Sequence, residues 1–211
     1  MTYTDIVNRV KAIMEEITPF DDGFAVLTSN TDVKPIVSYI ESCLQSSADE
    51  LLMICPIHLT SETTITAGLG GSPKLDNGKY IGTIALDSDY IRLNTFKMEG
   101  WEKEVHRPIS VENPLYIQQK NPFTRGGNAK PVVVKKTGYL EIYTYDAGDT
   151  IETKTYVAQI ALPTTGTIVI NPKLIEPLCY LTAANVFSIL GSETTKLMQQ
   201  QVETLLKAEI L

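Results

Sequence analysis

The sequence is poor in the residues from which most catalytic and metal sites are built. Its 211 residues include only two histidines, His58 and His106, and neither has metal-ligand spacing to another histidine or to a cysteine. The cysteines are odd in number, widely spaced and set in apolar contexts. We therefore predict three buried free thiols rather than a disulfide or a metal site, at Cys43, Cys55 and Cys179. These features predict a protein that works without catalytic residues, metal or cofactor.

The sequence also lacks long apolar runs and an excess of positive charge. No apolar run approaches the ~20 residues of a membrane span, and the first five residues lack the basic and apolar regions of a signal peptide. Lysine and arginine total 18 against 25 for aspartate and glutamate, a net charge of −7. DNA binding that is independent of sequence relies on lysine and arginine side chains, which neutralise the phosphates. A chain with this net negative charge is therefore a poor candidate for binding nucleic acid tightly. We expect a protein assembled inside a cell, with no membrane partner.

Apolar periodicity is present at both ends of the chain. Hydrophobic residues make up 43% and charged residues 20%, the balance of a globular protein. Apolar side chains three and four residues apart predict helices over 2–17, 32–54 and 171–211. Thr2 and Asp5 have the spacing of a capping box at the first of these helices.

Three residues set the expected breaks inside these helical regions. Ser47 has capping-box spacing to Glu50, so the second helix either continues or restarts there. Asn171 and Pro172 are at the expected start of the C-terminal helices, and Pro177 leaves a later start at that residue open. Gly191 is a candidate C-cap before a last helix from Ser192.

The middle of the chain is predicted to be β-rich. Gly68, Gly70, Gly71 and Pro73 are expected to break regular structure, and a short helix over 110–119 is expected to be capped by Ser110. The strand candidates are rich in β-branched and aromatic residues and cover 63–66, 80–86, 90–101, 131–136, 139–145 and 153–162.

These elements predict an α+β fold. The N-terminal helices (1–56) and the C-terminal helices (171–211) must pack together to bury their apolar stripes, and they form one helical core. An antiparallel β-rich lobe over 57–170 is inserted between them.

Two polar patterns suggest enzyme sites and fit them poorly. The Gly68–Lys74 stretch lacks the Gly-Lys-Ser/Thr of a phosphate loop, because Pro73 separates Ser72 from Lys74. Asp87 and Asp89 read first as turn residues that accept local backbone N–H bonds.

Partner contacts are predicted at three places. The stretch 120–130 is basic, aromatic and flexible, and includes Phe123 and Arg125. Tyr139, Tyr143 and Tyr145 share one strand face, which is either a contact surface or a well-packed second face. The last helix offers the third set, Leu205, Leu206 and Leu211.

Two stretches carry a family resemblance. The first runs from Ile84 to Trp101 and continues through Val105 to Glu112–Tyr116. The second joins Lys130–Val132 to the strand Tyr139–Tyr145, and closes on Leu181–Ala184 and a final amphipathic helix. Together they resemble the head-to-tail connector (adaptor or ring) proteins of tailed bacteriophages, particularly those of crAss-like phages of gut bacteria.

The resemblance implies a structural virion protein, assembled in the host cytoplasm. Such proteins form a homo-oligomeric ring, commonly of twelve copies, below the portal vertex of the capsid. The helical core would pack against neighbouring copies, a C-terminal segment or extended loop would dock onto the portal protein, and the far face would receive the next tail or ring protein. The genomic DNA would pass through the channel without specific binding.

Two alternatives remain open. Another tail-completion or capsid-associated structural protein shares nearly all of these sequence features. A metal-dependent hydrolase would use Asp87, Asp89 or Glu99.

Overall fold

The N-terminal helix begins at the capping box that its sequence predicts. In the computed structural model, which describes residues 1–17, 36–76, 79–121, 123–146, 148–164 and 166–209, the Thr2 N–H donates to Asp5 Oδ2 at 2.9 Å. In return, the Asp5 N–H donates to Thr2 Oγ1 at 3.2 Å. Two backbone donors at the helix start are thereby satisfied, and α1 covers Tyr3–Ile17. Residue 32, where the sequence predicts the start of the second helix, lies outside the described residues.

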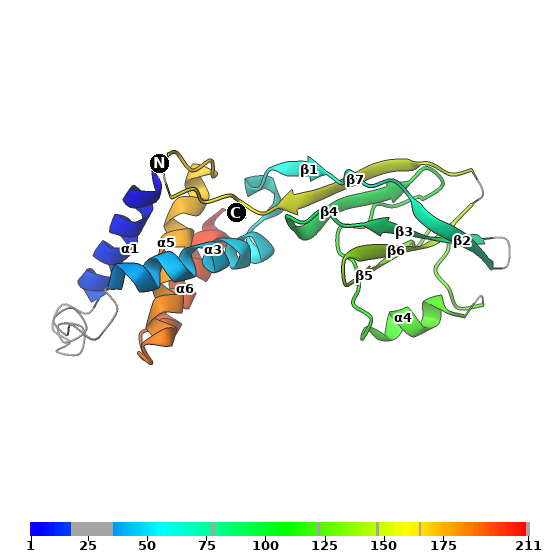
Figure 1. Cartoon of the computed structure of the whole chain (residues 1–211). Helices are drawn as coiled ribbons and strands as arrows, with labels where there is room; N and C mark the ends of the chain where they lie inside the picture. The colour runs from blue at the N-terminus through cyan, green and yellow to red at the C-terminus, as the bar shows by residue number, and fades with distance from the viewer. Residues whose placement is uncertain (18–35, 77–78, 122, 147, 165, 210–211) are drawn as a thin grey trace. The chain divides into compact units, whose positions relative to one another are not determined.

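Helices from both ends of the chain form one bundle (Figure 1). Helix α5 (Pro172–Ile189) contacts α1, α3 (Ile36–Ile54) and α6 (Thr195–Ala208). Apolar side chains that are buried completely or almost completely, such as Leu44 and Leu178, fill the space between the helices. At the edge of this core, Asn185 Nδ2 of α5 donates to Ser47 Oγ of α3 at 3.0 Å.

The β-rich part consists of two antiparallel sheets (Figure 1). One sheet has the strand order β1-β7-β4 and the other β2-β3-β6-β5. A single hydrophobic cluster joins residues of both sheets, among them Phe96 and Tyr156 from the first and Ile84 and Leu140 from the second. The strand bounds are β1 Glu62–Thr64, β2 Gly70–Asp76, β3 Lys79–Ala85, β4 Tyr90–Met98, β5 Val132–Lys136, β6 Tyr139–Tyr145 and β7 Ile151–Ala158.

The chain divides into a helical unit and a β-rich unit. The helical unit comprises Met1–Thr60 and Gln159–Leu211, and the β-rich unit comprises Ser61–Ala158. The sequence placed the inserted lobe over 57–170, so both ends of the β-rich unit lie inside that range. Hydrogen bonds explain the difference at the C-terminal end, because the Ile168 N–H donates to the Met1 carbonyl at 2.9 Å. At the other end, Asn171 Nδ2 donates to the Leu59 carbonyl at 3.2 Å, beside the 3-10 helix η1 (Ile57–Leu59).

The predicted α+β class is confirmed, with terminal helices in one unit and antiparallel sheets in the other. Among the described residues, no helix is both long and apolar enough to cross a membrane.

The structure decides two alternatives that the sequence left open for the helices, and it differs from the sequence prediction at the cap of one short helix. Helix α3 continues through Ser47, whose hydroxyl donates to the Cys43 carbonyl one turn earlier. Helix α5 starts at Pro172, with Asn171 Oδ1 accepting from the Lys173 N–H, and continues past Pro177 because that ring is buried in the core. The short helix α4 covers Pro114–Gln119 and is capped by Asn113 rather than by Ser110.

A strand forms where glycine and proline predicted none. Strand β2 pairs with β3 at the edge of its sheet, and the register shifts between Gly70 and Lys74. Pro73 lies in this irregularity, which is where a strand tolerates a residue without an N–H donor. Strand β7 ends at Ala158, four residues before the predicted end at Leu162.

The separate cores predict that a core substitution acts first on its own unit. Trp101, the sole tryptophan, is buried in the β-rich unit, so its fluorescence reports that unit, while circular dichroism at 222 nm reports mainly the helical unit. We expect Leu178→Ala, a truncation worth about 2–5 kcal/mol, to lower the thermal midpoint seen by circular dichroism by about 10 °C or more. Leu140→Ala should instead lower the fluorescence midpoint by a similar amount. Equal movement of both midpoints in both variants would show a single cooperative unit.

Candidate interaction surface

The carboxylates suggested for a hydrolase lie at opposite ends of strand β4. Asp87 and Asp89 precede the strand and Glu99 follows it, so the strand length separates them by roughly 30 Å. Each accepts a hydrogen bond from a segment distant in the sequence. Asp87 accepts from the Thr66 N–H, Asp89 from the Tyr156 hydroxyl at 2.7 Å, and Glu99 from the Thr150 hydroxyl at 2.9 Å. The Thr66 bonds hold the pKa of Asp87 below its usual value. These carboxylates are used to close turns and to join strands.

The described residues also hold no group of three or more His, Cys, Asp or Glu side chains placed to bind a metal ion. The prediction of buried free thiols is confirmed for all three cysteines. Burial raises the pKa of the Cys179 thiol to about 12, so this sulfur stays protonated and unreactive at neutral pH.

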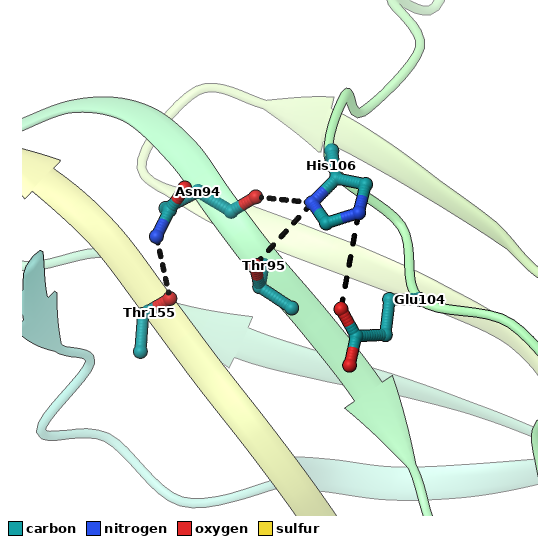
Figure 2. Close-up of polar contacts among 5 residues, drawn as sticks. All are labelled: Asn94, Thr95, Glu104, His106 and Thr155. Atoms are coloured by element: carbon teal, nitrogen blue, oxygen red, sulfur yellow. Dashed lines mark hydrogen bonds and ion pairs between the residues drawn. The ribbon is translucent and has the colours of Figure 1, made fainter. Parts of the chain in front are cut away.

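His106 lies in the arrangement that most resembles a catalytic group (Figure 2). Its Nδ1 is 3.3 Å from Thr95 Oγ1, and its Nε2 is 3.8 Å from Glu104 Oε2. A hydroxyl, an imidazole and a carboxylate in this order have the composition of a nucleophilic triad.

The proton positions argue against that role. His106 Nδ1 is also 2.9 Å from the Asn94 backbone carbonyl, which can only accept a hydrogen bond. Nδ1 must therefore carry a proton, and it cannot take one from the Thr95 hydroxyl. Val105, the neighbouring residue, forms a two-way backbone bridge with Phe96, so His106 helps to hold this segment against β4.

The polar chemistry of the β-rich unit gathers instead around α4, β5 and β6. The Tyr116 ring of α4 meets the Tyr143 ring of β6 edge-on, with 6.5 Å between ring centroids. Lys120 and Lys136 both lie over Tyr116, at 4.7 and 5.3 Å from its centroid. Lys136 also lies 5.8 Å from the centroid of Tyr139. Such cation–π contacts keep the ammonium groups near the rings without neutralising their charge.

Glu141 fixes the centre of this group. Its carboxylate accepts from Lys136 Nζ at 2.6 Å and from the Tyr143 hydroxyl at 2.9 Å. The bond to Glu141 raises the pKa of Lys136, and burial together with Glu141 raises the pKa of Tyr143. At neutral pH Lys136 is therefore charged and Tyr143 is a neutral donor. An open groove of about 480 Å³ adjoins this centre and is lined by Val111, Lys135, Lys136, Thr137 and Tyr139.

The loop after α4 is fastened by one buried side chain. Gln119 is 2% exposed, and its Oε1 accepts from the Gly126 N–H at 3.1 Å while its backbone carbonyl accepts from Arg125 Nε at 2.6 Å. The Asn121 side chain accepts from the Phe123 N–H at 3.0 Å. The loop that the sequence described as flexible is thus held by several hydrogen bonds.

This ordered loop and α4 expose large apolar side chains. Phe123 is 93% exposed and Ile117 is 71% exposed, and Val111 and Leu115 are close to half exposed. We call these four residues, together with Tyr116, Lys120, Arg125, Lys135, Lys136 and Tyr139, the α4 surface. Large exposed apolar side chains bordered by charge are typical of a protein-binding site.

Charge is distributed unequally between the two units. Residues 61–158 hold twelve lysines and arginines and twelve aspartates and glutamates, so the helical unit carries the whole net charge of −7. Within the β-rich unit, residues 107–136 hold six basic residues and one acidic residue, Glu112. The α4 surface has four basic side chains, one of which, Lys136, is paired with Glu141, so it remains locally basic in an acidic protein.

The residues predicted to contact partners differ in how exposed they are. Phe123, Arg125 and Tyr139 belong to the α4 surface, with Arg125 lying 6.0 Å from the Tyr143 ring centroid. Tyr143 is only 4% exposed, because α4 covers it. Tyr145 is also buried, but it lies in the hydrophobic cluster that contains Leu140 and Ile142, beyond the register shift between β3 and β6. The prediction that the three tyrosines share one strand face is therefore wrong for Tyr145.

The contacts predicted in the last helix are less available. Leu206 is buried and packs within the helical unit, and Leu205 is half-buried. Leu211 lies outside the described residues.

Sequence reasoning missed Gln119, Ile117 and Leu115. An amphipathic pattern cannot be recognised in a helix of six residues, and nothing marks Gln119 as buried until the loop folds over it. One signal was available in the sequence, namely several large apolar residues within the otherwise polar stretch between Ser110 and Lys130.

A comparison of the sequence with protein-family models gave no match, and a comparison with curated proteins gave none.

We predict that two adjacent glycines of the loop differ sharply in how much stability is lost when each is replaced by alanine. A Cβ added to Gly126 would lie 2.2 Å from the Lys130 carbonyl oxygen, whereas one added to Gly127 meets nothing within 4 Å. We expect Gly126→Ala to cost about 2 kcal/mol or more and to lower the thermal midpoint of Trp101 fluorescence by roughly 10 °C. The matched variant Gly127→Ala should leave the midpoint within about 2 °C of the unaltered protein. Equal stability of the two variants would mean that the loop is not closed in this way.

Proposed function

We propose that this protein is a structural subunit of a tailed-bacteriophage connector. In this role copies of the chain form a ring below the portal, link the capsid to the tail, and line the channel through which the genome passes. Its partners are neighbouring copies, the portal protein and the next tail or ring protein. The protein would be located in the virion, after assembly in the host cytoplasm.

The observation that carries the proposal is the α4 surface. An ordered loop that leaves a phenylalanine 93% exposed beside basic groups gains little within one chain, because burying such a side chain is worth roughly 2 kcal/mol or more. A partner that covers it recovers that free energy. Several polar side chains of the β-rich unit, by contrast, form hydrogen bonds that join segments distant in the sequence.

Two further features support the connector role. The resemblance to phage connector proteins covers both the strands of the β-rich unit and the C-terminal helices. The helical unit carries the net negative charge, and an acidic channel wall repels phosphate, so DNA would pass without being held.

Mass measurement tests this proposal directly. We expect native mass spectrometry of the purified chain, alone or mixed with the portal protein of the same genome, to show a discrete homo-oligomer whose mass is a whole multiple of 23.3 kDa. A chain that stays monomeric alone and also ignores the portal would contradict the proposal. Reconstruction of the virion should place the density of this chain between portal and tail. Density elsewhere on the particle would favour a tail-completion or capsid-associated protein instead.

A further inference from the structure

We propose that the α4 surface of one copy binds the C-terminal end of helix α3 on the next copy. This inference rests on the proposed function, since it assigns the contact by which copies of the chain join into a ring. Each copy would use one surface of its β-rich unit and a different surface of its helical unit.

The C-terminal end of α3 exposes a second apolar stripe. Met53 is 51% exposed and Ile54 is 53% exposed, and Ile57 follows at 38%. Glu50 lies three and four residues before Met53 and Ile54 in α3, which places these three side chains near one another. Ile57 follows in the 3-10 helix η1. Asn185 Nδ2 donates to the Glu50 carboxylate at 3.2 Å and so holds it beside this stripe.

The electrostatics of this helix end favour a basic partner. Helix α3 contains Glu41, Asp49 and Glu50 and no lysine or arginine, and its last turn has no basic residue. The C-terminus of a helix carries about half a negative charge from its unpaired carbonyls. That charge is left without a cation on α3 itself.

The α4 surface is complementary to the end of α3 in charge and also exposes apolar side chains. It presents four exposed apolar side chains and lies within a stretch with six basic residues and one acidic residue. Burial of apolar side chains and attraction of opposite charges therefore act in the same contact. A phosphate backbone would satisfy the lysines but would leave Ile117, Leu115 and Val111 in water, so a second copy fits better than nucleic acid.

The two surfaces differ, so the contact is heterologous. One copy offers its α4 surface to the next and receives another on its own α3, which makes head-to-tail association that closes into a ring when the rotation allows. The chain thus carries both halves of its self-association contact.

Charge-swap variants test the inference, with assembly followed by native mass spectrometry and sedimentation. We expect Lys120→Glu and Glu50→Lys each to weaken self-association by about 30-fold, as at a binding hot spot. Mixing the two variants should restore assembly, because an altered surface on one protein then meets its complement on the other. Lys196→Glu and Glu193→Lys change the net charge equally at other exposed sites, and both should assemble normally.

A second variant separates binding from folding. Phe123→Ser should weaken assembly by a similar factor and leave the thermal midpoint unchanged, because the side chain is 93% exposed. If rings form only on the portal, the same comparisons are made in its presence.

The outcomes distinguish the inference from the proposed function. If the unaltered protein assembles and all three surface variants assemble equally well, the assigned contact is wrong while the ring role stands. If the unaltered protein assembles neither alone nor on the portal, the ring role itself fails. Binding of DNA by the unaltered protein that Lys120→Glu abolishes would overturn the inference and assign the α4 surface to nucleic acid.

Discussion

Thr144 holds together the strand, the tryptophan and the loop on which the α4 surface depends. Its backbone φ is 70°, a left-handed conformation that costs a threonine about 1–2 kcal/mol. In that conformation its carbonyl accepts from Trp101 Nε1 at 2.8 Å, and its hydroxyl donates to the Gly126 carbonyl. The buried indole is thereby fixed to β6, and the loop that carries Phe123 is fixed to the same residue. The strain is offset by hydrogen bonds that would otherwise be missing from the core.

Around that anchor, several polar side chains of the β-rich unit join its strands to neighbouring segments. The Tyr156–Asp89 and Thr150–Glu99 pairs each join a strand to a neighbouring turn or strand end. His106 shows how far composition alone can mislead. A hydroxyl and a carboxylate both lie near its ring, yet the Asn94 carbonyl fixes a proton on the nitrogen that would have to accept one. The position of the imidazole proton, and not only the types of neighbouring residues, determines whether such a group can act as a base.

The two units divide the chemistry of the protein between them. The helical unit carries the net negative charge and an exposed apolar helix end, and the β-rich unit is neutral overall with a basic, apolar surface. Apolar side chains are exposed on both surfaces, with Met53 and Ile54 on the helical unit and Ile117 and Phe123 on the β-rich unit. Exposed apolar side chains on both units gain free energy only when another molecule buries them, and the proposed ring contact would do so.

The sequence by itself determined the elements whose signals are local. Apolar spacing of three and four residues, the Thr2–Asp5 box and the Asn171–Pro172 start predicted the terminal helices, and alternation predicted most strands, because these patterns depend on residues close in the chain. Tertiary structure decided the rest. Strand β2 exists because β3 pairs with it despite Pro73, and helix α5 passes through Pro177 because packing outweighs one lost backbone bond. Gln119 is buried and holds the loop after α4 by hydrogen bonds, and Tyr143 is buried beneath α4. Both depend on contacts between segments distant in the sequence, which no local pattern encodes.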